Sequence, residues 1–105
     1  MGLCVASIKL SRFEEASTAC TDAINAIEMS DSTLGRGRHG KYLKSIAYSN
    51  RGIARYLAND DTAAMTDFTT ALMLNDNAIV KNNASTLKAS LSIDNGEYSS
   101  VSFAD

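Results

Sequence analysis

The 105-residue sequence has no proline, no tryptophan and a single histidine. Because proline is absent, no residue forces a break inside a helix, and Gly, Asn, Asp and Ser have to supply the turns. Long apolar runs are also missing, since no stretch approaches the ~20 residues that a transmembrane helix needs. There is no excess of basic residues: the net charge of -2 gives no indication of a surface that binds nucleic acid.

The motifs of common active sites are missing as well. The sequence has no metal-ligand spacing, no phosphate-binding loop and no nucleophile elbow. The adjacent acids Glu14-Glu15 and Asp60-Asp61 stand at expected helix starts, where the helix dipole and the N-cap account for them. His39 has no cysteine near it in the sequence, so we expect an exposed loop residue. We predict that the protein is not an enzyme and uses neither metal nor cofactor.

What the sequence does contain is typical of one folded helical domain. It is 45% hydrophobic and 21% charged, which is ordinary for a folded chain. Alanine and leucine are plentiful, and no extended alternation of β-branched residues occurs. These features predict an all-α fold.

Five helices are expected, over residues 3–10, 13 to near 30, 41–58, 62–74 and 78–93. Residues 31–40 are expected to be irregular. Asn59 tolerates the left-handed conformation that ends a helix, and Asp60 or Asp61 can cap the next one. The expected inner faces are formed by Ala16, Cys20, Ala23, Ile24, Ile27, Tyr42, Ile46, Ser49, Ile53, Tyr56, Leu57, Ala64, Met65, Phe68, Ala71 and Leu72.

Two parts of the chain resemble each other. In both, a short helix and a tight turn precede a helix with the pattern Ala-x3-large-x2-Ala-large, which starts at Ala16 and again at Ala64. This pattern resembles the tetratricopeptide repeat (TPR), a helix–turn–helix unit of 34 residues. Residues 45–78 cover one full unit. Its packing positions are held by Tyr48, Gly52, Ala64, Phe68 and Ala71, and Asn50-Arg51-Gly52 after an aromatic residue resembles small bacterial members.

The resemblance implies a right-handed array of helical hairpins, with about two repeats and a C-terminal capping helix. We expect a truncated first repeat over residues 1–30, an insertion over 31–44, the full repeat over 45–78 and the cap over 79–93, all in a single domain. Arg51 stands where the family has leucine, and Asp76 where it has the closing proline. Arg51 is expected to pair with an acid, for which we select Asp67.

TPR proteins bind peptides in a concave groove lined by the first helices of successive units. Carried over to this chain, the groove residues are Val5, Ile8, Lys9, Ser49, Asn50, Ile53, Tyr56, Leu57, Val80, Asn83 and Leu87. Asn50 is expected either to bond a peptide backbone or to bond within the array. The Lys, Asn and Arg clamp of chaperone-binding members is matched by Asn50 alone, so we do not expect that function.

The two cysteines stand at positions that face each other in the family. Cys4 and Cys20 form either a disulfide or two reduced core thiols. A bridge would indicate an oxidising compartment such as the periplasm, and reduced thiols the cytoplasm.

The resemblance implies a scaffold or adaptor that binds an unidentified protein or peptide without catalysing a reaction. The alternative is a structural module that self-associates as a dimer through its groove or end helices, because about three repeats are usual in a stable array.

The basic cluster of Arg36, Arg38, His39, Lys41 and Lys44 is expected to be solvated. The tail over residues 94–105 is either disordered or docked in extended form, with Tyr98, Val101 and Phe103 as its apolar residues.

Overall fold

A computed structural model describes residues 2–29 and 38–93 of the chain, with side chains described over residues 2–29 and 39–86. Its helices are α1 (Gly2–Lys9), α2 (Phe13–Met29), α3 (Arg38–Leu57), α4 (Asp61–Leu74) and α5 (Ala78–Ile93). No strand occurs among the described residues, so the predicted all-α class is confirmed. The tail over residues 94–105 and residues 31–37 of the insertion, which include Arg36, lie outside the described part.

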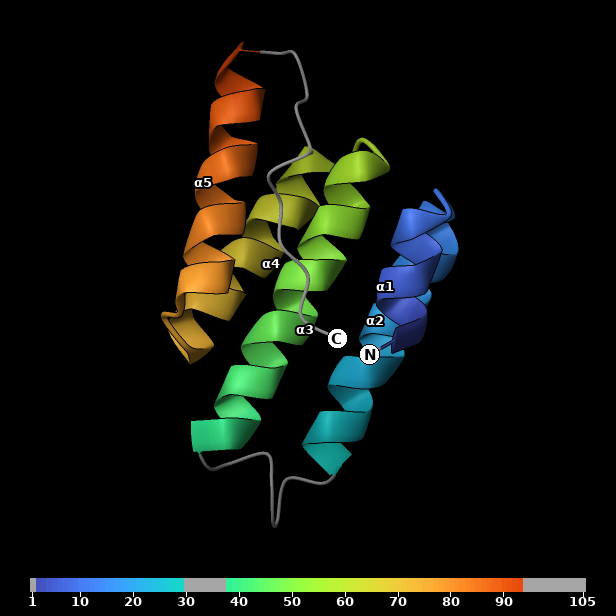
Figure 1. Cartoon of the computed structure of the whole chain (residues 1–105), viewed down its shortest axis with the longest axis vertical. Helices are drawn as coiled ribbons and strands as arrows, with labels where there is room; N and C mark the ends of the chain where they lie inside the picture. The colour runs from blue at the N-terminus through green and yellow to red at the C-terminus, as the bar shows by residue number, and fades with distance from the viewer. Residues whose placement is uncertain (1, 30–37, 94–105) are drawn as a thin grey trace.

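The helices form antiparallel pairs that lie side by side (Figure 1). Helix α1 packs against α2 and α3 against α4, while α3 also contacts α2 and α5. Helix α3 lies at the centre and contacts every other helix. The face of α3 between α1 and α5 is therefore bordered by the first and the last of the described helices.

The turns of the two hairpins have the same geometry. Ser11 and Asn59 both adopt the left-handed conformation, with φ of 61° and 68°. Immediately after each, the backbone N–H of Arg12 donates to Ser7 and that of Asp60 to Arg55, both at 2.8 Å. These bonds satisfy carbonyls at the helix ends, as left-handed C-caps do. The prediction for Asn59 is confirmed, and Asp60 caps α4 by accepting a hydrogen bond from the Ala63 N–H at 3.3 Å.

One predicted boundary is wrong. Helix α3 begins at Arg38, three residues before the expected Lys41, and the described helix includes His39 and Gly40. Gly40 normally disfavours a helix interior, but it is buried here. Packing of this turn outweighs the local preference of glycine for a break.

The core contains the apolar residues expected from the helical periodicity. Its larger cluster contains residues of α1, α2, α3 and α4. A smaller cluster of Ile46, Ala71 and Val80 joins α3, α4 and α5. Phe68 is the largest side chain among those less than 2% exposed. Most other expected inner residues are also buried; Ala23, Ile27, Tyr42, Leu57, Met65 and Leu72 are half-buried.

Gly52 lies at the close contact between α3 and α4. A Cβ atom at this position would lie 3.0 Å from Cε2 of Phe68 and 3.2 Å from the carbonyl oxygen of Ala64. The absence of a side chain therefore lets the two helices approach each other. Ala64 and Phe68 are buried beside it, so the sequence prediction of a close approach at Gly52 is confirmed.

A disulfide ties α1 to α2. Cys4 and Cys20 are bonded, with Cα atoms 4.9 Å apart, and both side chains are fully buried. Of the two states left open by the sequence, the structure has the bridge. An eight-residue helix is too short to be stable alone, so the covalent link helps to hold α1 on the array.

Candidate binding face of helix α3

The candidate site is the face of α3 that bears Ser49, Asn50 and Ile53. All three side chains are buried. This face lies between α1 and α5, which Figure 1 shows on opposite sides of α3. Ile53 packs in the same cluster as Cys4 and Ile8 of α1, while Ser49 contacts α5. The face is thus built from three helices that are far apart in sequence.

Two serine–asparagine pairs hold α5 against α3. The Nδ2 of Asn83 donates to the Oγ of Ser49 at 3.3 Å, and the Nδ2 of Asn77 donates to the Oγ of Ser45 at 3.0 Å. Asn77 also caps α5, because its Oδ1 accepts from the N–H of Val80 at 3.1 Å. Sequence reasoning missed Ser45 and Asn77, although an Asn three residues before a helical apolar residue is a recognisable N-cap signal.

Asn50 differs from these asparagines. Its side chain is only 1% exposed, yet neither Nδ2 nor Oδ1 has a hydrogen-bond partner among the described residues. Leaving a buried amide unpaired costs about 1–3 kcal/mol. The sequence left open whether Asn50 bonds within the array; the described part of the chain provides no such bond.

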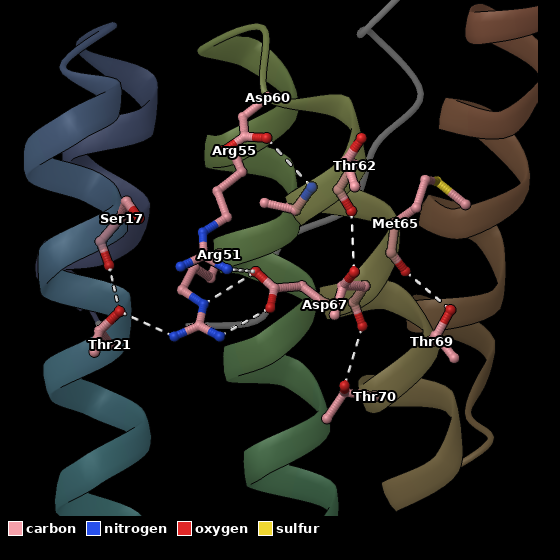
Figure 2. Close-up of polar contacts among 12 residues, drawn as sticks. Ser17, Thr21, Arg51, Arg55, Asp60, Thr62, Met65, Asp67, Thr69 and Thr70 are labelled. Atoms are coloured by element: carbon pink, nitrogen blue, oxygen red, sulfur yellow. Dashed lines mark hydrogen bonds and ion pairs between the residues drawn. The ribbon is translucent and has the colours of Figure 1, made fainter.

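A charged cluster lies on another side of α3 (Figure 2). The Nη2 and Nε of Arg51 donate to the two carboxylate oxygens of Asp67 at 2.8 and 3.0 Å, and the Nη1 of Arg55 donates to Oδ2 at 3.1 Å. The predicted Arg51–Asp67 pair is confirmed. Asp67 is 2% exposed, so this carboxylate is buried with both oxygens occupied.

The same cluster reaches the first hairpin. The Nη1 of Arg51 donates to Oγ1 of Thr21 at 3.0 Å, and this hydroxyl in turn donates to the carbonyl of Ser17 (Figure 2). The guanidinium also lies 5.1 Å from the ring centroid of Tyr48, within range of a cation–π interaction. The hydrogen bond to Asp67 raises the pKa of Arg51, against the opposing effect of burial. Arg51 therefore stays charged, and the cluster joins α2, α3 and α4.

Most residues predicted to line the groove are buried. This holds for Val5, Ile8, Ser49, Asn50, Ile53, Tyr56, Val80 and Asn83. Lys9 is exposed at the end of α1, Leu57 is half-buried, and the side chain of Leu87 lies outside the described part. The structure brings residues of α1, α3 and α5 to one region. It also shows that a ligand would have to contact a face whose side chains are already covered.

The residues predicted to pack the repeat lie at the contact between α3 and α4. Gly52, Ala64, Phe68 and Ala71 are buried, and Tyr48 is half-buried.

His39 and Lys41 are exposed, and Lys44 is half-buried. The side chain of Arg38 is outside the described part. Within the described residues, no group of three His, Cys, Asp or Glu side chains is arranged to hold a metal ion. In the same part of the chain, no helix combines the length and the apolarity needed to cross a membrane.

Comparison with known proteins gave no match: no family model, no curated protein and no solved structure aligns significantly with this chain.

Proposed function

We propose that this chain is a TPR-like array of two repeats and a cap that binds an extended peptide and catalyses no reaction. Three observations support the architecture. The two hairpin turns share one geometry, and Gly52 admits a close approach by α4. The hydrogen bond between Ser49 and Asn83 also joins positions 34 residues apart, which is the length of one repeat.

The observation that carries the binding function is the unpartnered amide of Asn50. A side-chain amide offers one donor group and one acceptor, which is the pair that a peptide unit complements. An extended peptide has these groups available, because it does not use them in its own helix. Binding would then satisfy a buried polar group that the described part of the array leaves without a partner.

The closed Arg51–Asp67–Arg55 cluster supports a non-catalytic role. Both carboxylate oxygens of Asp67 accept hydrogen bonds from guanidinium groups. The carboxylate is also only 2% exposed, so a substrate could not reach it to be deprotonated. The cluster is better suited to fixing the angle between the two hairpins.

The disulfide supports an oxidising location such as the periplasm. Protein disulfides persist in such compartments and are rare where thiols are kept reduced. Thiol titration of the protein purified from its native cells without reductant tests this location. The expected result is no free thiol, whereas two free thiols would place the chain in a reducing compartment.

Self-association is a second candidate function, favoured by the outer face of α4. The hydroxyl groups of Thr66, Thr69 and Thr70 donate to backbone carbonyls four residues earlier in α4. Their hydrogen-bond donors are therefore already used within the helix. Met73 is 83% exposed beyond them. Apart from the buried Asp67, the only charged residue of α4 is the exposed Asp61 in its first turn, so two copies that meet through the rest of this face would bring no like charges together.

Light scattering across micromolar concentrations tests self-association. A dimer that Thr69→Lys converts to monomer would support contact through α4, because paired copies would bring two buried cations together. A strict monomer at all concentrations would exclude it.

The peptide-binding proposal is tested with a displayed library of random 12-residue peptides. Wild type is expected to enrich peptides whose affinity falls at least tenfold, about 1.4 kcal/mol, for Asn50→Leu. This variant removes the amide while keeping a side chain of similar volume, so the free energy of unfolding should not fall. Thr66→Ala, on the outer face of α4, is the matched control and should bind like wild type.

The proposal fails if selected peptides bind Asn50→Leu as tightly as wild type. It also fails if no peptide is enriched against wild type.

A further inference from the structure

The outer face of α4 carries a stripe of exposed side chains at the spacing that is used in helix pairs. The stripe consists of residues four, three and four positions apart, namely Thr62, Thr66, Thr69 and Met73. All of these side chains are exposed, so the described helices leave the stripe uncovered. Alternating steps of three and four residues place side chains along one side of a helix, where a second helix can pack lengthwise.

A hollow and a projecting side chain lie at different levels of this stripe. The hollow has a volume of about 570 Å³ and extends along α4 from Asp61 to Thr70. Thr62, Met65 and Thr69, which Figure 2 labels, are among its lining residues. Met73 lies beyond it, near the end of the helix, and is 83% exposed. A methionine side chain is flexible enough to fill an irregular gap. Because both features face outward from the same helix, Met73 of one copy can enter the hollow of another.

An antiparallel pair of copies brings these two features together, and a parallel pair does not. With a two-fold axis between Thr66 and Thr69, Thr62 of one copy lies opposite Met73 of the other. In a parallel pair the two Met73 side chains would lie beside each other, about 16 Å along the helix from Thr62. A two-fold pairing uses the same surface on both copies, so two methionines fill two hollows.

Charge favours the same arrangement. Asp61 is exposed at the start of α4. Lys81 is exposed on α5, which runs antiparallel to α4, and it lies beside Leu72 near the end of α4 (Figure 1). In an antiparallel pair the start of one α4 meets the end of the other, so Asp61 of each copy comes level with Lys81 of its partner. Lys81 also pairs with Asp76 at 3.4 Å, but its side chain is 60% exposed and its ammonium group has donors left for a second carboxylate.

We propose that two copies of this chain dock through α4 in an antiparallel, two-fold arrangement, in which each Met73 enters the other copy's hollow and each Asp61 faces Lys81. The inference rests on the proposed self-association and specifies its surface and register. The occupant of the stripe is a second copy, since the hollow, the projection and both charges are present on the same chain. The opposite charges fix the register more than they add affinity.

Cross-linking of variants with one introduced cysteine tests the arrangement. A short bismaleimide reacts only with the introduced thiol, because Cys4 and Cys20 are bonded to each other. In the proposed dimer the two copies of Thr66 lie about 5 Å apart along the helix axis, and those of Thr62 about 16 Å apart. Thr66→Cys should therefore give about tenfold more cross-linked dimer than Thr62→Cys. Equal yields would indicate a parallel pair and overturn the proposal.

Light scattering on the wild type separates this inference from self-association itself. If the protein is a dimer but neither variant cross-links, the copies meet through another surface, so the arrangement falls and self-association stands. A strict monomer at all concentrations would remove both.

Charge exchange provides a second test of the register. Asp61→Lys and Lys81→Asp should each raise the dissociation constant of the dimer about tenfold, because each places like charges opposite each other at two symmetric contacts. The double variant Asp61→Lys/Lys81→Asp restores opposite charges and should dissociate like wild type. A double variant as weak as the single ones would show that these residues do not meet, and the proposed register would be wrong.

Discussion

Gly52 lies at a close contact between α3 and α4, so a side chain at this position would affect how near the two helices can pack. We predict that Gly52→Ala destabilises the protein by up to about 2 kcal/mol. Alanine gains ~1 kcal/mol of helix propensity, but its Cβ would meet a buried ring and a backbone carbonyl, and overpacking costs about 1–3 kcal/mol. Urea unfolding followed by circular dichroism measures the difference.

The matched control for this change is Gly2→Ala in α1, because a Cβ there has nothing within 4 Å. It should leave the urea midpoint unchanged or slightly raised. A stabilising Gly52→Ala would show that α4 can move away from α3 at no cost.

Asp67 is buried and pairs with two arginines, so its replacement should lower the free energy of unfolding substantially. Asp67→Ala is predicted to lower the free energy of unfolding by about 3 kcal/mol, near the lower end for a broken buried pair, because both guanidinium groups keep some access to water. Asp76 is the control: it pairs with Lys81 at 3.4 Å, but both side chains are more than half exposed. Asp76→Ala should change stability by less than ~1 kcal/mol. Equal losses in the two variants would contradict the structural role of Asp67.

At the scale of elements, the docking of α1 depends strongly on one covalent bond. The disulfide between Cys4 and Cys20 closes a loop of 16 residues, and a loop of about this size contributes roughly 3 kcal/mol by restricting the unfolded chain. Reduction should therefore lower the urea midpoint and speed hydrogen exchange in α1 before α4. A Cys4→Ala/Cys20→Ala variant should be insensitive to reductant. An unchanged midpoint after complete reduction would show that packing alone holds α1.

At the scale of the whole molecule, α3 contacts all four other helices, unlike a helix in a long repeat array. We predict a single cooperative unfolding transition, because losing α3 removes the packing surface of every other element. Three tyrosines, Tyr42, Tyr48 and Tyr56, lie in α3, so tyrosine fluorescence reports mainly on this helix. Its urea transition should coincide with that of far-UV circular dichroism. Loss of helix signal well before the tyrosine change would indicate independent unfolding of an end hairpin.

Much of this architecture can be predicted from the sequence because it depends on local periodicity. The 3.6-residue spacing from Ala16 to Ile24 and from Ala64 to Ala71 identifies the inner faces, and the left-handed tolerance of Asn59 marks a turn. The start of α3 was predicted incorrectly, because burial of Gly40 overrides a local preference that favours a break. Ser11 ends α1 in the left-handed conformation although serine rarely adopts it, since the disulfide and core packing hold the hairpin closed.

The sequence by itself determined that this protein is helical, where its hairpins turn and which residues are small enough for helices to approach, since each depends on neighbours within one or two helical turns. Only the tertiary structure decided which polar groups are satisfied. Asn83 and Asn77 donate to serines on α3, and Asp67 accepts from a second arginine, Arg55, whereas the amide of Asn50 is buried without a partner in the described chain. Hydrogen-bond pairing across helices depends on register and depth, which spacing along one chain does not encode.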